Sequence, residues 1–513
     1  MRLRRIVVFA VVAYGWVSTS IATAQTHRSE IPRWAAIVHE LALKAPVPKN
    51  EQNSTGVFPP IIPEYLPSLD RSGVVETYNT VAPIDTSKNP FFLSLGSNGR
   101  SCATCHEPRS GWGVSALSIQ QRFYASHGTD PIFRVVDGAT CDTDDVGSFD
   151  AKLSAYRLLL SKGLIRIFLP LPETQLGTDP PMSRDFEIVD VDDPYGCTNL
   201  SAAPPMVSAY RRPLLAANLR FLGCSTTDPS CTPSPLSVMW DGREPSLASQ
   251  AVDATLGHAQ APERPSGEQV SEIVDFESNI YDAQVFDFSG GRLDQDGATG
   301  GPFFLSEQPF FVGINDSLSP DFNEIAFTFF DSWEGIANGS DTAASRIAIA
   351  RGETIFNTKA FTISNVNGLN LEPTDPLGQA PISGTCTTCH DSPNVGSHSE
   401  KLPLNIGVAD ASPPVLDTDG LPVFTVQCTA ASGPLQGQVF HVTDLGRAML
   451  IGKCADVGKV KGPILHSLAA RAPYFHNGSA ATLKDVVNFY DQRFRIGLTQ
   501  QEQSDLIAFL KSL

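Results

Sequence analysis

The chain has 513 residues, a length that predicts two or three domains with a sizeable hydrophobic core. Its formal net charge of −18 disfavours nucleic acid and anionic membrane surfaces as partners. The same acidic balance is compatible with a basic redox partner, although acidic surfaces more often serve solubility.

Residues 1–24 have the pattern of a secretory signal peptide. Three arginines stand close to the start, an apolar stretch follows over residues 6–17, and Ala22-Thr23-Ala24 forms a small-residue cleavage site. The apolar stretch is shorter than the roughly 20 residues that a membrane-spanning helix needs. We therefore expect an exported, periplasmic protein with no membrane span in its mature form; a retained N-terminal anchor is the alternative.

Two copies of the pentapeptide Cys-x-x-Cys-His carry most of the functional information. They are Cys102-Ala103-Thr104-Cys105-His106 and Cys386-Thr387-Thr388-Cys389-His390. In this motif the two thiols add to the vinyl groups of a haem and the histidine binds its iron. A zinc site would need two more ligands at a set spacing, and a redox dithiol needs no adjacent histidine. The sequence therefore predicts two covalently bound c-type haems with His106 and His390 as iron ligands.

Six cysteines remain outside these motifs. An even number in an oxidising compartment predicts up to three disulfides, with buried free thiols as the alternative. Proximity in the sequence suggests the pairs Cys141–Cys197, Cys224–Cys231 and Cys428–Cys454.

Several helix starts are marked by capping residues. Ser266 with Gln269 and Thr499 with Glu502 form capping boxes, and a helix is expected to begin near Thr482. A further helical stretch over residues 344–356 precedes the second motif.

Segments rich in proline, glycine and aspartate separate these helices. Residues 140–201, 289–302 and 392–437 are expected to be long loops or insertions, with a possible β-hairpin at 421–442. We therefore predict a mainly α fold with two cytochrome c-like haem domains, residues 25–343 and 344–513, and long loop insertions.

Two further segments add to the haem motifs. One is Trp240-Asp241-Gly242-Arg243 with Gln250 following, and the other is Ala472-Pro473-Tyr474-Phe475-His476-Asn477-Gly478. Together with both motifs they resemble the bacterial di-haem cytochrome c peroxidase superfamily, which includes the methylamine-utilisation enzyme MauG. The resemblance covers roughly residues 80–125, 205–285 and 345–513. It implies that the His106 haem binds hydrogen peroxide at an open iron position, while the His390 haem is six-coordinate and passes electrons.

The resemblance also suggests roles for two aromatic residues. Trp240 matches the family's tryptophan between the haems, where it would carry electrons; a core aromatic is the alternative. Tyr490 stands fourteen residues after His476, where MauG has a tyrosine ligand and the peroxidases have methionine. A phenolate oxygen would stabilise ferric iron. The alternatives for this sixth ligand are Met449 and, more weakly, His398 and His441, and Tyr490 would then be a helix-face aromatic.

The reactive site departs from the family pattern. Gln260 stands where the family has a glutamate that acts as acid and base, and an amide cannot shuttle a proton. His258 has the chemistry to take over this role, because histidine titrates near neutral pH. Alternatively, His258 or His127 binds the first iron and blocks it, or His258 has only a packing or surface role.

A second departure concerns calcium. Arg211 and Arg471 stand approximately where family members hold a calcium ion between the haems. A guanidinium there would supply positive charge without the ion, so we expect no calcium at that place.

We expect a periplasmic di-haem oxidoreductase that is peroxide-dependent. Electrons from a small cytochrome c or cupredoxin would enter at the His390 haem, cross by Trp240 and reach the His106 haem, where His258 and Gln260 would assist catalysis. One alternative is a MauG-type oxidase that uses high-valent iron on a protein or organic substrate. The other is a di-haem electron-transfer cytochrome without turnover.

Overall fold

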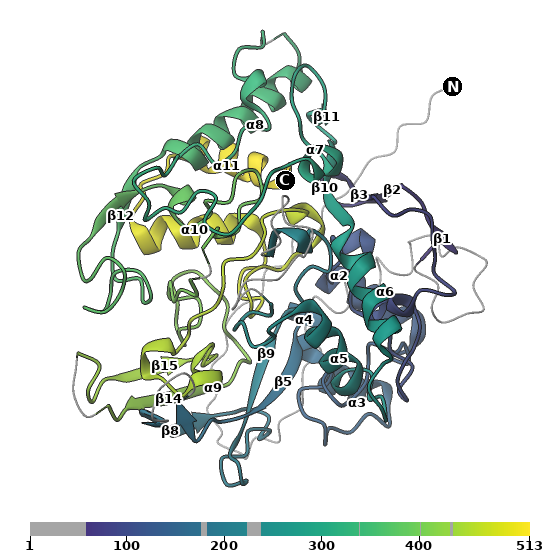
Figure 1. Ribbon diagram of the computed structural model, residues 1–513, viewed down its shortest axis with the longest axis vertical. Helices are drawn as coiled ribbons and strands as arrows, with labels where there is room; N and C mark the ends of the chain where they lie inside the picture. The colour runs from purple at the N-terminus through teal and green to yellow at the C-terminus, as the bar shows by residue number, and fades with distance from the viewer. Residues whose placement is uncertain (1–57, 176–181, 223–237, 338, 401, 431–433) are drawn as a thin grey trace, which may run out of the picture. The chain divides into compact units, whose positions relative to one another are not determined.

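A computed structural model describes residues 58–175, 182–222, 238–337, 339–400, 402–430 and 434–513 (Figure 1). The predicted signal peptide and the predicted Cys224–Cys231 pair lie outside these residues. Among the described residues, no helix is both long enough and apolar enough to cross a membrane.

The prediction of a mainly α fold is wrong. Helices account for 29% of the chain and strands for 18%, and the strands form many small sheets. Most of these strands are short, and several lie inside segments whose composition predicts loops. Some of them have partners that are distant in sequence, as where Phe186–Asp192 pairs with Val423–Cys428, so that hydrogen bonding to a remote strand rather than a local pattern fixes their conformation.

The helices of the described part of the chain begin in most cases at a serine or threonine cap. The capping boxes at Ser266 and Thr499 and the helix start at Thr482 are confirmed. The helices are α2 (Ala116–Ser126), α3 (Phe149–Ala155), α4 (Arg157–Lys162), α5 (Leu247–Gly257), α6 (Gly267–Ser278), α7 (Pro302–Ser306), α8 (Asp341–Thr358), α9 (Ala448–Ile451), α10 (Leu483–Phe494) and α11 (Gln500–Lys511).

The strands pair antiparallel throughout the described sheets. They are β1 (Ile61–Ile62), β2 (Tyr65–Leu69), β3 (Gly73–Asn79), β4 (Ile84–Asp85), β5 (Ile165–Pro170), β6 (Thr174–Gln175), β7 (Met182–Ser183), β8 (Phe186–Asp192), β9 (Met206–Arg211), β10 (Ile280–Asp287), β11 (Gly291–Arg292), β12 (Phe361–Ile363), β13 (Ile382–Gly384), β14 (Val423–Cys428) and β15 (Val439–Val442).

A four-stranded sheet has the order β11-β10-β3-β2, and a three-stranded sheet has the order β15-β14-β8. The predicted hairpin at 421–442 is confirmed, because β14 pairs with β15 in the register Phe424 to Val442. Strand β8 pairs with the other edge of β14, so strand pairing crosses the expected boundary at residue 343. Phe424 and Val426 of this sheet are buried together with Met449 of α9 in a separate hydrophobic cluster.

Helices α8 and α11 pack side by side over the largest hydrophobic cluster (Figure 1). Gly352 makes this close approach possible, since a Cβ at this position would lie 2.1 Å from the backbone oxygen of Asp505. Arg351 adds an ion pair across the contact, with its Nε 2.7 Å from Oδ2 of Asp505. The packing places the last helix of the chain against the helix that precedes the second haem motif.

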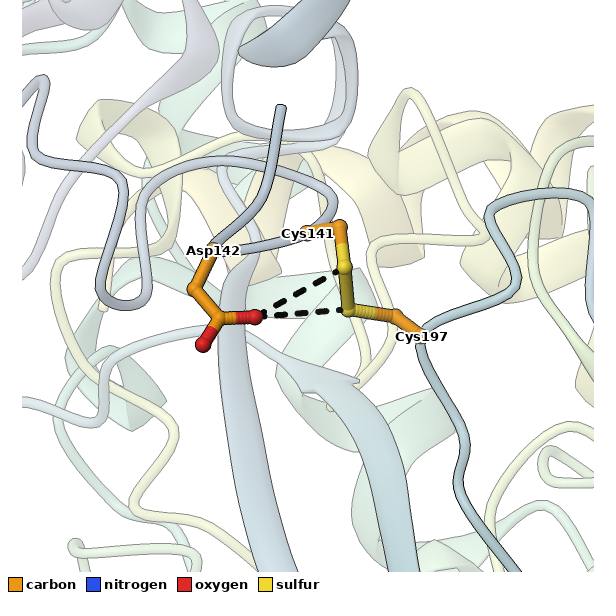
Figure 2. Close-up of side chains that lie close together, drawn as sticks. All are labelled: Cys141, Asp142 and Cys197. Carbon is orange, nitrogen blue, oxygen red and sulfur yellow. Dashed lines mark hydrogen bonds between the residues drawn. A yellow bond between two sulfur atoms is a disulfide. The ribbon is translucent and has the colours of Figure 1, made fainter. Parts of the chain in front are cut away.

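Two of the suggested disulfides are confirmed. Cys141 pairs with Cys197, and Cys428 pairs with Cys454. Beside the first bond, Oδ1 of Asp142 lies 3.6 Å from the sulfur of Cys141 and 3.8 Å from that of Cys197 (Figure 2). In the described ranges, Cys141, Asp142 and Cys197 are the side chains with metal-binding atoms that lie close enough together to hold one ion. The two sulfurs, however, are bonded to each other. We therefore do not read this group as a metal site.

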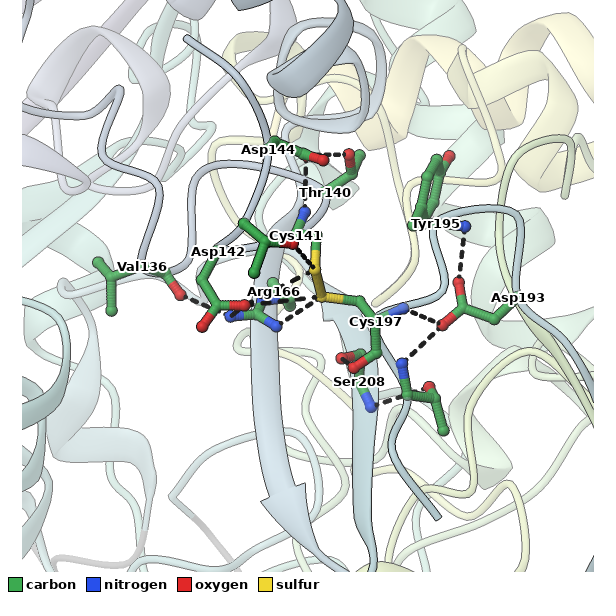
Figure 3. Close-up of a disulfide and its surroundings, with 12 residues drawn as sticks. Val136, Thr140, Cys141, Asp142, Asp144, Arg166, Asp193, Tyr195, Cys197 and Ser208 are labelled. Atoms are coloured by element: carbon green, nitrogen blue, oxygen red, sulfur yellow. Dashed lines mark hydrogen bonds and ion pairs between the residues drawn. A yellow bond between two sulfur atoms is a disulfide. The ribbon is translucent and has the colours of Figure 1, made fainter. Parts of the chain in front are cut away.

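The surroundings of this disulfide are polar. Nη1 of Arg166 lies 2.9 Å from the sulfur of Cys197, and its Nη2 forms an ion pair of 3.2 Å with Asp142 (Figure 3). Arg166 belongs to β5, whose neighbouring residues Ile165 and Ile167 line a large cavity. The disulfide thus joins the loop of Cys141 to that of Cys197, and Arg166 of β5 contacts both this bond and the carbonyl of Val136.

Candidate functional site

The first haem motif forms a short 3₁₀ turn, Cys102–Thr104, closed by a capping box between Ser101 and Thr104. The turn brings Cys102, Cys105 and His106 to the wall of one cavity. Nδ1 of His106 lies 2.9 Å from the carbonyl oxygen of Trp112 and therefore carries the hydrogen. Nε2 of His106 is left as the nitrogen that can bind a metal.

The second motif repeats this geometry. A 3₁₀ turn over Cys386–Thr388 is closed by a capping box between Thr385 and Thr388. Nδ1 of His390 lies 2.8 Å from the carbonyl oxygen of Gly396. Both histidines are therefore held in the tautomer that an iron ligand requires.

The first cavity is large and mostly apolar. With its opening to solvent it contains about 1480 Å³ of empty space. Helix α5 contributes one face to it, because Leu247, Gln250, Ala254 and His258 recur at helical spacing. The cavity thus has a wall carrying the haem motif and a helical wall with two polar side chains.

His258 stands at the end of α5 and is held by a buried ion pair. Its Nδ1 is bonded to Oδ2 of Asp137, and the other oxygen of Asp137 is paired with Arg100. Arg100 is anchored in turn, because its Nε donates to the carbonyl of Pro131 over 2.8 Å. Burial alone would raise the pKa of Asp137, but Arg100 and His258 outweigh it and lower that pKa. An ionised Asp137 thus orients the His258 ring, and Nε2 is the nitrogen free to interact in the cavity.

Gln260 is not brought to the cavity. Its side chain is exposed, and its Oε1 accepts a hydrogen bond of 3.3 Å from Asn98. The backbone carbonyl of Gln260 accepts a further bond of 2.8 Å from the hydroxyl of Ser97. Sequence reasoning also missed Asp137 and Arg100, which no motif marks. Gln250, which follows the Trp-Asp-Gly-Arg segment in the sequence, does line the cavity.

The second cavity is lined mainly by aromatic and aliphatic side chains, and Tyr490 lies among them. Tyr490 comes from α10, and its ring centroid is 6.5 Å from that of His390. His398 lines the same cavity, with its Nδ1 3.0 Å from Oδ2 of Asp391.

The other candidate ligands lie elsewhere. Met449 is buried beside β14, outside the lining of either cavity. His441 is on β15, within 3.2 Å of the hydroxyl of Thr425, and His127 caps α2 beside Phe149. Of the proposed sixth ligands, Tyr490 and His398 are therefore those that the fold brings to the second motif.

One wall is common to both cavities, and Trp240 is part of it. The shared residues are Arg212, Pro213, Leu215, Trp240, Lys461, Pro463 and Arg471. The indole Nε1 donates to the carbonyl of Arg212 over 2.8 Å, and the carbonyl of Trp240 accepts from the Lys461 amide over 2.9 Å. The ring lies 6.0 Å, centroid to centroid, from that of His476. An indole is thus fixed between the two candidate sites.

Arg211 is buried in a charged cluster behind this wall. It pairs with Asp241 of the Trp-Asp-Gly-Arg segment and, over 2.6 Å, with Asp444. Burial alone would raise the pKa of Asp444, but Arg211 outweighs it and lowers the pKa to about 2. Arg471, the second residue expected at the calcium position, lines both cavities instead.

The residues present fit a c-type haem in each cavity. Each cavity combines two cysteine thiols outside any disulfide, a histidine with a free Nε2 and a largely apolar lining. These are the groups that would attach the porphyrin, bind its iron and exclude water from its faces.

Several curated relatives match parts of the chain, and no protein-family model matches it. The cytochrome-c peroxidase IdrP2 of Denitromonas iodatirespirans is 35% identical over 137 residues, which are 25% of this chain and 36% of that protein. The cytochrome-c peroxidase IdrP1 of the same organism is 28% identical over 197 residues, 36% of this chain and 44% of that protein. IdrP2 of Pseudomonas sp. (strain SCT) is 32% identical over 135 residues, 25% and 35% of the two chains.

One solved structure also aligns with the chain, a MauG-like protein associated with microbial copper homeostasis. The alignment has a TM-score of 0.36 and 15% identity, and covers 88% of this chain and 94% of the other. This score is below the level at which two folds are considered the same.

The local sequence matches confirm the predicted resemblance to cytochrome c peroxidases. They also support the predicted enzyme class, a peroxidase-type oxidoreductase. The chain spans less than half of the length of these curated relatives.

Proposed function

We propose that the protein is a periplasmic di-haem c-type oxidoreductase that reduces hydrogen peroxide with electrons from a small donor protein. The observation that carries this proposal is the pair of cavities, each with a Cys-x-x-Cys-His motif, that share a wall containing Trp240. The names of the curated relatives, cytochrome-c peroxidases, support peroxide as the oxidant.

The two cavities support a division of labour. The first contains His258 and Gln250 on the helical wall opposite the motif, which suits a site where a small polar oxidant reacts. In the second, Tyr490 faces His390 and would occupy the remaining iron position. Iron held in the two sites would supply the electron transfer and the site of O–O cleavage.

His258 is the group proposed to move protons in the first cavity. Reduction of one peroxide to two waters consumes two electrons and two protons. Nε2 of His258 would accept the proton of the bound peroxide and return it to the departing oxygen, a role that contributes about 10²–10⁴-fold to rate. Asp137 would hold the ring in place, and Arg100 would keep Asp137 ionised. Gln260, which is exposed, would act at most from outside the cavity.

Electrons are proposed to pass through the shared wall. A small cytochrome c or cupredoxin with a basic surface would complement the charge of −18. From the His390 site the path would run by Trp240, whose ring is fixed by its bond to Arg212. Calcium is not needed in this scheme, because Arg211 and Arg243 already pair with Asp241 and Asp444.

A MauG-type oxidation of a protein or organic substrate is the second candidate. The presence of Tyr490 rather than Met449 in the second cavity favours it, since a phenolate would stabilise oxidised iron. A di-haem cytochrome without turnover is the third, and it requires that His258 bind the first iron.

Electron paramagnetic resonance of the purified protein distinguishes these candidates. We expect two haems per chain, with one high-spin and one low-spin ferric signal, or a high-spin signal that develops after half-reduction. Peroxide should be consumed with reduced cytochrome c or cupredoxin as donor. Two low-spin haems in both states, unchanged by peroxide, would rule out the enzyme. Oxidation of an organic substrate without consumption of donor electrons would favour the MauG-type reaction.

A further inference from the structure

Two arginines in the shared wall have no carboxylate partner among the described residues. Arg212 is 6% exposed, and its guanidinium donates only to carbonyl oxygens, those of Lys162, Val114 and Arg471. Arg471 is half-buried; its Nη2 donates over 2.9 Å to the carbonyl of Ile464, and its Nε has no partner. Both side chains line both cavities.

These two arginines differ from other buried arginines of the protein. Arg100, Arg122 and Arg211 are each ion-paired with one or two carboxylates. A buried cation without an ion-paired carboxylate is costly, because it loses hydration and regains little Coulomb energy. For Arg471, the carboxylate of Asp282 acts on the charge without forming an ion pair with it. In keeping with this, burial lowers the pKa of Arg212 to about 9, with a further contribution from the charge of Arg471, and burial lowers that of Arg471 to about 10. The wall is therefore built to receive negative charge.

The required ligand is a carboxylate that reaches the wall from within the cavities. Arginine binds carboxylates through its planar fork of N–H donors. Each haem carries two propionate groups, which are carboxylates at one edge of the ring. A haem attached at Cys102 and Cys105 and another attached at Cys386 and Cys389 would share the wall that contains both guanidinium groups.

We propose that Arg212 and Arg471 form one cationic clamp that binds propionates of both haems. This proposal rests on the two-haem function proposed above. A fixed positive charge beside both haems stabilises their reduced states, so the clamp raises the midpoint potentials of both cofactors together. Arg212 and Arg471 are positioning residues in this scheme, since they act on the iron through the propionates.

The test measures haem content and then both midpoint potentials. The variants are Arg212→Gln and Arg471→Gln, with Arg212→Lys and Arg471→Lys as charge-conserving partners. Arg243→Gln is the matched control, because Arg243 lines only the first cavity and is already ion-paired with Asp241. Redox titrations followed by visible and electron paramagnetic resonance spectra separate the high-spin haem from the low-spin one.

We expect each Gln variant to shift the ferric–ferrous equilibrium of both haems at least tenfold toward ferric, about 59 mV for a one-electron couple. The Lys variants should have midpoint potentials close to those of the wild type. Arg243→Gln should change the midpoint potential of the first haem at most. A shift confined to one haem, or equal shifts in Gln and Lys variants, would overturn the clamp. If added acetate or phosphate lowers the potentials of the wild type but not those of the Gln variants, the wall binds a free anion and the propionate assignment is wrong.

Two outcomes separate this inference from the function on which it rests. A wild-type protein without two covalent haems would refute the proposed function itself. A wild-type protein with two haems and Gln variants with unchanged potentials would refute only the clamp. Arg212→Gln removes the hydrogen-bond donor of three backbone carbonyls and could therefore fail to fold. In that case Arg471→Gln provides the test, because the side chain of Arg471 donates to one carbonyl.

Discussion

Nδ1 of His258 is bonded to the carboxylate of Asp137, a residue 121 positions earlier in the chain. The helix that presents His258 to the first cavity and the loop that holds its ring therefore come from separate parts of the fold. Asp137 is itself fixed by Arg100, which lies just before the first haem motif. The orientation of the ring is thus coupled to the position of the motif that faces it.

The first prediction concerns this pair. His258→Ala should lower the rate of peroxide consumption by about 10²–10⁴-fold, because His258 is the group proposed to move the proton in this cavity. Asp137→Asn should cause a smaller loss, since the ring keeps its chemistry and loses its orientation. Gln260→Ala is the control and should change the rate little, because its side chain is exposed. Equal losses in His258→Ala and Gln260→Ala would contradict the assignment.

The second prediction concerns Trp240. Trp240→Phe should slow electron transfer from the second haem to the first while leaving haem content unchanged, because it removes the indole and its bond to Arg212. Rapid mixing of half-reduced protein with peroxide measures this step directly. Trp333→Phe is a matched control, since its indole also donates to a backbone carbonyl, over 2.9 Å, but lines neither cavity. Similar rates in both variants would remove Trp240 from the path.

A third prediction concerns the sixth ligand of the second haem. Tyr490→Phe should convert the low-spin ferric signal of that haem to a high-spin signal, because the oxygen ligand is lost. Met449→Leu should leave the spectrum unchanged, since Met449 is packed beside β14. The spectra of the ferric proteins provide the measurement. A low-spin signal that persists in Tyr490→Phe would point instead to His398, which lines the same cavity.

Local features of the structure could be predicted from the sequence, and non-local ones could not. The haem turns, the helix caps and the pairs Cys141–Cys197 and Cys428–Cys454 each depend on residues at short or moderate separation. The error in fold class came from pairings such as β3 with β10 and β8 with β14, whose partners lie in distant segments. The burial of β3 and β14 alternates, but nothing in their local sequence identifies their distant partners.

The same distinction holds for the candidate site. His106, His390 and Tyr490 were predicted from motifs and lie on the two cavities. Asp137 is marked by no motif, and its bond to His258 depends on how a loop folds back over α5. Gln260 was placed by counting along the chain, but α5 ends at Gly257 and Gln260 has a φ of +55°, so the helical spacing no longer applies there.

The fourth prediction concerns stability and pH. Glu353 on α8 is 1% exposed. Burial raises its pKa to about 8, although the hydrogen bond from the amide of Phe330 acts in the opposite direction. The unfolded chain releases this proton near the ordinary value of 4.5, while the folded protein keeps it until about pH 8. Folding stability should therefore fall as pH rises between these values, by up to about 1.4 kcal/mol per pH unit.

Denaturant titrations between pH 5 and pH 8 (about the span of the shift) measure this effect. Glu353→Gln should reduce the slope and be more stable than the wild type at the alkaline end. Part of the slope should remain, because burial also raises the pKa of Glu277 to about 8. Glu268→Gln, a change at an exposed position of α6, is the control. Parallel slopes in wild type and Glu353→Gln would show that Glu353 is not the source.

The fifth prediction compares the two disulfides. Replacing both cysteines of either pair by serine should lower the free energy of unfolding by about 2–4 kcal/mol. Cys141–Cys197 closes 56 residues and Cys428–Cys454 closes 26. The loss should therefore be larger for the first pair by about 0.6 kcal/mol, the value for a doubling of loop length. Chemical denaturation of both double-serine variants measures the difference, and a larger loss for the second pair would contradict this reasoning.

The shared wall also sets an order for the maturation of the protein. The first motif is made early in synthesis, but its cavity includes Lys461, Pro463, Ile464 and Arg471, which are made much later. A nascent chain that has reached its second motif still lacks this part of the first site. A haem attached to Cys102 and Cys105 before that point would sit in an open half-site, so the first site cannot reach its final form until Arg471 has been made.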